Sequence, residues 1–163
     1  MAFDLARELD GLDWAILREL QANARITFSE LGRRVSLSAP AVAERVRRME
    51  EAGVVTGYRV ELDLERLGFP LLAFIRVRVS PLTKDALEKD LERCAEVLEC
   101  HQVTGEDCYI VKLAARSVRD LQETVGALGQ HGATTTSLAL SCPVPHRALG
   151  LSADRHAEST AAS

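Results

Sequence analysis

The sequence predicts an α+β protein with two domains, a helical one followed by one built on a β-sheet. Apolar residues recur every three to four positions as far as Met49, which is the period of a helix. They alternate with polar residues from Leu71 to Ser80, which is the period of a half-buried strand. Gly68 and Pro70 interrupt both periods. We therefore expect a first domain over residues 1–61, a linker over 62–69, a second domain over 70–147 and a disordered tail over 148–163.

Three helices are predicted in the first domain. The first covers about residues 10–23, with Asp10 as its N-cap. The second follows Thr27, which is spaced for a capping box with Glu30. Residues 36–38 then break the helical period, and Ser38 caps a third helix. Two short helices joined by a tight turn, with the second one exposed, form a helix-turn-helix.

A β-hairpin is predicted after the third helix, which stops at Gly53. Apolar and polar residues alternate through GVVTGYRVELDL, around a turn at Thr56 and Gly57. A hairpin at this place makes the domain a winged helix-turn-helix.

The exposed face of the third helix is the candidate DNA-binding surface. Its first residues are small, so that the helix can approach base edges closely, and its arginines can reach phosphates or guanine. The candidate residues are Ser38, Ala39, Pro40, Ala41, Glu44, Arg45, Arg47 and Arg48, with Arg59 on the predicted wing. The pattern alone also fits a solvated helix in an ordinary bundle. The net charge of the chain is −4, so a DNA-binding form should be a dimer or larger.

The second domain shows a different order of elements. Strands are predicted over residues 71–80, 97–103, 108–115 and 134–142, and helices over about 83–95 and 117–129. In the first strand Ile75, Val77 and Val79 share one face, so we expect an antiparallel sheet buried on one side. The order βαββαβ is that of a ferredoxin-like domain.

The composition favours a cytoplasmic protein without a metal or cofactor. No apolar run approaches the ~20 residues that span a bilayer, and the first residues are acidic, unlike a secretory signal. The four cysteines match no zinc-binding spacing, so we expect them to be small buried side chains.

The layout resembles that of the Lrp/AsnC family of feast/famine regulators over residues 10–147. The matching segments are LDWAILRELQANARITFSELGRRVSLS, ERVRRMEEAGVVTGYRV and ECHQVTGEDCYIVKL. The resemblance implies a transcriptional regulator whose first domain binds double-stranded operator DNA. It also implies that the second domain pairs its sheet with that of another subunit, that dimers assemble further, often to octamers, and that small effectors, usually amino acids, bind between these domains.

The resemblance places the effector site on the turn between the second and third strands. The implied residues are Thr104, Gly105, Glu106, Asp107, Cys108 and Tyr109, with Thr134 and Thr136 on a facing strand. Many family members carry an aspartate where Cys108 stands. Either Asp107 takes over the recognition of an ammonium group, or the pocket relies on backbone groups. A glycine at position 105 permits positive φ and close backbone approach.

Three other functions are considered. A Cys100–His101 nucleophilic pair is conceivable, but neighbours on a strand point to opposite faces. Sirohaem decarboxylases resemble this architecture, yet have little use for an intact basic recognition helix. An amino-acid sensor without DNA function would not need the first 60 residues. We therefore expect a regulator and no enzyme.

Overall fold

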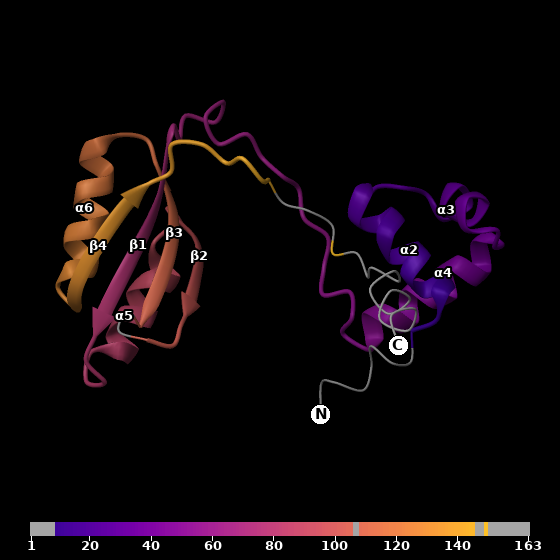
Figure 1. Ribbon diagram of the computed structural model, residues 1–163, viewed down its shortest axis with the longest axis horizontal. Helices are drawn as coiled ribbons and strands as arrows, with labels where there is room; N and C mark the ends of the chain where they lie inside the picture. Colours follow the sequence, from indigo (N-terminus) through magenta and orange to yellow (C-terminus); the bar gives the residue numbers. More distant parts are fainter. Residues whose placement is uncertain (1–8, 106–107, 146–148, 150–163) are drawn as a thin grey trace, which may run out of the picture. The chain divides into compact units, whose positions relative to one another are not determined.

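The computed structural model describes residues 9–105, 108–145 and 149. The chain divides into two compact units, a helical one that includes the described residues up to Val60 and a second one over Glu61–Pro143. Figure 1 shows the helices of the first unit and the sheet of the second. The α+β class predicted from the sequence is confirmed. Apart from Leu149, the predicted tail lies outside the described residues.

The helical unit contains the three predicted helices, which are α2 (Gly11–Ala22), α3 (Phe28–Val35) and α4 (Ala39–Glu51). A complete capping box opens α2. The Asp10 carboxylate accepts hydrogen bonds from the amides of Leu12 and Asp13, each at 2.8 Å. The Asp13 carboxylate accepts one from the Asp10 amide at 3.2 Å. These bonds satisfy amide donors that the first turn of a helix leaves without partners.

Only half of the capping box predicted for α3 is formed. Thr27 Oγ1 accepts a hydrogen bond from the Glu30 amide at 3.2 Å, as expected. The Glu30 carboxylate, however, is bound by Arg33 and Arg34 instead of the Thr27 amide. The two guanidinium groups lower the pKa of Glu30 to about 2, so this carboxylate stays charged at neutral pH. Charge-assisted bonds to arginine outcompete the weaker bond to a neutral amide.

The turn between α3 and α4 is tight because its backbone lies directly against α3. Ser36 adopts a left-handed conformation with φ of 59°, and the Leu37 amide then bonds to the Gly32 carbonyl at 2.8 Å. Ser38 accepts a hydrogen bond from the Ala41 amide at 3.3 Å and so caps α4. A Cβ atom on Gly32 would lie 2.5 Å from the Leu37 carbonyl oxygen. The turn therefore requires glycine at position 32.

The predicted wing is wrong. No strand is present between residues 54 and 70, all of which the structure describes. Val54 and Val55 pack against the helical core, and both of their amides bond to the Met49 carbonyl. Farther along, Val60 is 81% exposed. An alternating pattern forms a hairpin only where the apolar face of its strands is buried. Here the helical core ends at Val55, and Val60 farther along the chain stays exposed.

The second unit contains a four-stranded antiparallel sheet in the order β2-β3-β1-β4. Its strands are β1 (Leu71–Val79), β2 (Val97–Gln102), β3 (Tyr109–Ala115) and β4 (Gly132–Leu138). The central pair aligns Ile75 with Val111 and Val77 with Tyr109, and all four side chains are buried. The alternation predicted for the first strand is thereby confirmed.

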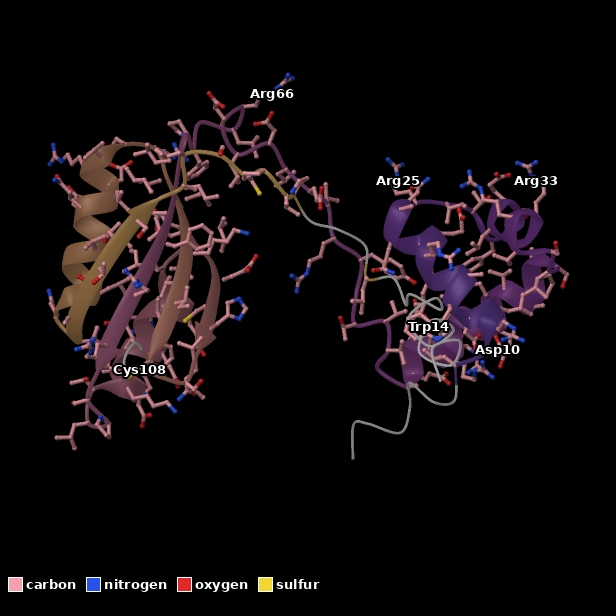
Figure 2. The ribbon with its side chains drawn as sticks, viewed as in Figure 1. Asp10, Trp14, Arg25, Arg33, Arg66 and Cys108 are labelled. Atoms are coloured by element: carbon pink, nitrogen blue, oxygen red, sulfur yellow. The ribbon has the colours of Figure 1, made fainter. Side chains whose placement is uncertain are left out.

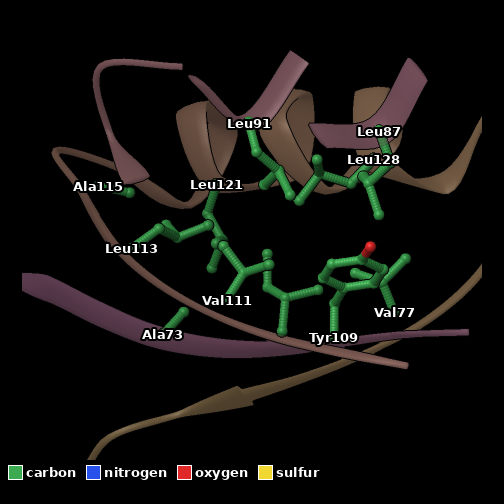
Figure 3. Close-up of a cluster of buried hydrophobic side chains, with 11 residues drawn as sticks. Ala73, Val77, Leu87, Leu91, Tyr109, Val111, Leu113, Ala115, Leu121 and Leu128 are labelled. Atoms are coloured by element: carbon green, nitrogen blue, oxygen red, sulfur yellow. The ribbon is translucent and has the colours of Figure 1, made fainter. Parts of the chain in front are cut away.

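Helices α5 (Lys84–Arg93) and α6 (Val118–Gly129) cover one face of this sheet (Figure 1). Leu87 and Leu91 from α5, and Leu121 and Leu128 from α6, pack against the inward side chains of β1 and β3 (Figure 3). This is the βαββαβ arrangement that the sequence predicts, with the fourth strand ending at Leu138 instead of residue 142.

We predict that Gly32→Ala lowers the free energy of unfolding by about 1–3 kcal/mol, because the new methyl group meets backbone in the turn. Gly126→Ala is the matched control. It also replaces a helical glycine, but a Cβ there has no atom within 4 Å, so the variant should gain about 0.5–1 kcal/mol. Urea unfolding measures both, and equal effects would contradict the turn geometry.

Candidate DNA interface and effector site

Helix α4 presents a buried face and an open face. Val42, Val46 and Met49 lie in the core. The predicted DNA-binding residues that are exposed are Ser38, Pro40, Glu44, Arg47 and Arg48, whereas Ala39, Ala41 and Arg45 are half-buried. The open face thus combines a capped, small-residue N-terminus with arginines two to three turns farther along. This combination suits a helix that enters the major groove with its N-terminal end toward the bases.

A buried carboxylate ties α4 to α2. Asp13 is 0% exposed, and its oxygens bind two arginines of α4. Arg45 Nη1 lies 2.7 Å from Oδ1, and Arg48 Nη2 lies 2.8 Å from Oδ2. A carboxylate at such a depth is tolerated only with charged partners and full hydrogen bonding. The pair of arginines therefore fixes the orientation of α4 on the bundle.

The two arginines differ in their surroundings. Arg45 also donates to Asp10 at 2.8 Å and its side chain is only 24% exposed, whereas that of Arg48 is 58% exposed. The carboxylates of Asp13 and Asp10 raise the pKa of Arg45, which stays charged. Its guanidinium faces α2 and holds α4 against that helix. The DNA contact predicted for Arg45 from the sequence stays a prediction.

Arg47 lies wholly on the open face. It binds Glu44 at 2.6 Å and Glu51 at 2.5 Å, one turn to either side. Exposed pairs of this kind contribute little to stability, so phosphate can displace the carboxylates readily. Arg25 and Arg33 project from another part of the helical unit (Figure 2). Arg59 is exposed in the segment where the wing was predicted.

The role of Asp13 was not predicted from the sequence. The signal was present, because Asp13 stands three residues before Ile16 and seven before Leu20, and both of these are buried. An acidic residue on the apolar stripe of a helix demands a buried cationic partner. The partners themselves lie more than thirty residues away in the sequence.

The turn predicted to bind an effector follows β2. The Val103 amide bonds to the Cys108 carbonyl at 2.9 Å, and the Cys108 amide bonds to the Val77 carbonyl at 3.1 Å. Thr104 and Gly105 are exposed, and Gly105 has a φ of +114°, a conformation that glycine permits. Glu106 and Asp107 lie outside the described residues. Cys108 is half-buried, and its sulfur points to the Val79 carbonyl at 3.6 Å.

Tyr109 connects this turn to the helix layer. Its side chain is 2% exposed, and its hydroxyl donates a hydrogen bond of 2.5 Å to Glu88 on α5. Figure 3 shows the ring among the core side chains, with its oxygen toward the helices. Burial and the neighbouring Glu88 charge raise the pKa of Tyr109, so the phenol stays protonated. Its ring is therefore part of the core and is not displayed on the turn.

Thr134 and Thr136 lie on β4, opposite Val77 and Ile75 of β1. Directly paired residues point to the same side of a sheet, so both threonines lie on the side that the helices cover. Thr134 and Tyr109 flank Val77 in one row, about 10 Å apart at the usual strand spacing. Within one subunit, the structure therefore places Thr134 two strands from the turn.

The cysteines and histidines give no catalytic arrangement among the described residues. Cys100 pairs with Val111 and His101 with Ile110, so the two neighbours face opposite sides of the sheet. Burial and the Glu88 charge raise the pKa of the Cys100 thiol, which makes it a weaker nucleophile at neutral pH. Across the ranges described, no cluster of three potential metal ligands occurs. No helix in the described part of the chain has the length and apolar character to cross a membrane.

Comparisons with known proteins agree with this arrangement. Residues 9–50 match the model of the AsnC-type helix-turn-helix domain, and residues 72–149 match that of the Lrp/AsnC ligand binding domain. The chain is 36% identical over 143 residues to the proline dehydrogenase transcriptional activator of Rhodobacter capsulatus, covering 83% of this chain and 93% of the relative. It is 40% identical over 116 residues to the transcriptional regulator LrpA of Mycobacterium tuberculosis, covering 71% of this chain and 77% of the relative.

A solved structure extends this similarity to three dimensions. A transcriptional regulator of Neisseria meningitidis in complex with L-Met superposes with a TM-score of 0.82 at 31% identity, covering 88% of this chain and 97% of that one. The fold, the two matched domains and these relatives define a DNA-binding transcriptional regulator with a ligand-binding domain. The chain belongs to the Lrp/AsnC family, which confirms the resemblance seen in the sequence.

We predict that Arg45→Gln destabilises the helical unit by about 1.5–3 kcal/mol, because it removes a charged partner from the buried Asp13. Arg47→Gln removes two exposed pairs from the same helix and should cost less than about 1 kcal/mol. Trp14, the single tryptophan of the chain, lies in α2 and reports unfolding of this unit by fluorescence. Similar losses in the two variants would show that Asp13 does not anchor α4.

Proposed function

We propose that this regulator binds its operator through the open face of α4 and that a small effector, of the amino-acid class, modulates this binding. The observation that carries the proposal is the exposed row of Pro40, Glu44, Arg47 and Arg48 on a helix that is capped and anchored from behind. Ser38, Ala39 and Ala41 allow close approach at its N-terminus, and Arg59 reaches a neighbouring phosphate. Arg45 orients the helix from inside.

The proposed assembly is a homodimer that associates further, up to an octamer. In the described part of the second unit, the helices cover only one face of the sheet. The other face carries Phe74, Ile110 and the Lys112–Glu99 ion pair, and Phe74 is exposed in the single chain. A second copy that packs on this face would bury the apolar side chains and double the number of phosphates reached, which an acidic chain needs. We also propose that the protein acts in the cytoplasm.

The proposed effector site is the turn between β2 and β3. Thr104 and Gly105 offer exposed hydroxyl and backbone groups, and the nearby sequence supplies the acids Glu106 and Asp107. A zwitterionic amino acid requires donors for its carboxylate and acceptors for its ammonium group. The neighbouring subunit is the proposed source of Thr134 and Thr136. The Neisseria regulator with bound L-Met supports the amino-acid class.

A role without catalysis is part of the proposal. The relatives are named as transcriptional regulators, and the Cys100 and His101 side chains diverge. The intact helix-turn-helix argues against both a sirohaem-decarboxylase-like enzyme and a sensor that does not bind DNA.

Two measurements on the full chain test the proposal. Selection from a random duplex library should enrich one sequence, and that duplex should bind more tightly than a random one. A thermal-shift screen of the twenty amino acids should identify an effector, since a ligand at 100 times its dissociation constant stabilises a protein by about 2.7 kcal/mol. Failure to enrich any sequence would reject the DNA function.

We predict that Gly105→Val abolishes the thermal shift by the effector while binding of the selected duplex persists. A β-branched residue is strained at a φ of +114°, so the turn must change its shape. Gly129→Val is the control, because a Cβ there has free space and its φ is not positive. Calorimetry that finds wild-type effector affinity in the Gly105 variant would reject the site.

A further inference from the structure

We propose that Asp13 is a specificity-determining residue, which holds Arg48 away from the phosphates of random DNA and releases it only to a matching base. The inference rests on the proposed DNA-binding function of α4. It concerns Asp13, which is itself too deeply buried to touch DNA. Asp13 therefore acts through Arg48, as a positioning residue.

The first argument is that Arg48 can leave Asp13 without depriving the buried carboxylate of a cationic partner. Asp13 would keep the bond from Arg45 Nη1 to Oδ1 at 2.7 Å, and its Oδ2 would keep the Asp10 amide at 3.2 Å. Arg45 is itself held in place by Asp10 at 2.8 Å. A buried carboxylate without a cation would be very costly, but one with Arg45 in place is still compensated.

The second argument is that Arg48 can move and Arg45 cannot. The Arg48 side chain is 58% exposed against 24% for Arg45, although both lie on α4 and share the same carboxylate. The exposed arginine therefore has a path toward solvent and DNA, and the enclosed one stays on Asp13. The division of roles follows from burial and not from the residue type.

The third argument concerns the exchange of partners. Moving Arg48 from a carboxylate to a phosphate replaces one charge-assisted bond by another. The exchange therefore adds little free energy to the binding of random DNA. A guanine in the right place offers two acceptors to one guanidinium and discriminates by about 1–3 kcal/mol. Only a cognate site therefore favours release, and Arg48 contributes to specificity much more than to general affinity.

The test compares a duplex selected on the wild-type protein with a random duplex of the same length. Arg48→Gln should weaken binding to the selected duplex by about 5- to 150-fold and change binding to the random duplex by less than about twofold. Asp13→Asn should strengthen binding to the random duplex. It frees Arg48 for a phosphate, so affinity rises and the slope of log K against log salt steepens by about 0.9 for each bound subunit.

Asp10→Asn is the matched control for Asp13→Asn. It removes one negative charge from the same cluster, and asparagine caps a helix as well as aspartate does, but Asp10 does not bind Arg48. Its salt slope on random DNA should stay at the wild-type value. Helical circular dichroism and Trp14 fluorescence check that each variant is folded. If Asp13→Asn does not fold, the Arg48→Gln comparison decides alone, because Arg48 is mostly exposed.

The outcomes separate the inference from the function on which it rests. Equal weakening of both duplexes by Arg48→Gln would overturn the inference and leave DNA binding by α4 intact. Equal changes in the salt slope for Asp13→Asn and Asp10→Asn would also overturn it. A wild-type protein that binds neither duplex would reject the proposed function and the inference together.

Discussion

One buried carboxylate determines how α4, the proposed DNA-binding helix, is held against α2. Asp13 lies at the start of α2, inside the helical bundle, and binds Arg45 and Arg48 of α4. Apolar packing of Val42, Val46 and Met49 would allow α4 to slide or rotate by small amounts, since such contacts have no preferred direction. Two charged hydrogen bonds to a fixed carboxylate remove that freedom. The direction of the open face in the free protein depends on this interaction.

The second unit is organised by the two faces of its sheet. The inward residues of β1 and β3 meet α5 and α6, and Tyr109 extends from this core to Glu88. Strand β3 follows the turn that contains Gly105, and Tyr109 at its start links this turn to α5 through a partly buried hydrogen bond to Glu88. The outward face carries Phe74 and is the surface proposed for a second copy. Assembly and ligand response would thus be built from opposite sides of a single sheet.

The elements that could be predicted from the sequence are those with a local cause. The caps at Asp10, Thr27 and Ser38 and the alternation in β1 depend on residues close in the chain, and the structure contains all of them. The hairpin after Gly53 was predicted from alternation around a turn at Thr56 and Gly57. It fails because Val60 lies beyond the helical core and is exposed. A pattern indicates a strand only when its buried face has a partner.

The open face of α4 was predictable from the sequence, whereas the contacts that its arginines make within the chain were not. The sequence places Arg45 on the flank of α4 and leaves the direction of its guanidinium open. The direction is decided by Asp13, which is distant in the sequence and adjacent in space. Likewise, the family resemblance implies a ligand contact for Tyr109, whereas the β3 register turns its ring into the core. Long-range pairing, which periodicity does not encode, determines the directions of both side chains.

Nitrogen-detected NMR of the arginine side chains tests the central claim most directly. The full chain, labelled on arginine and titrated with its selected duplex, should show a large shift of the Arg48 guanidinium signal. The Arg45 signal should keep its position, because Asp13 and Asp10 hold that group in both states. Saturation of the DNA with no shift at Arg48, or with equal shifts at both arginines, would contradict the account.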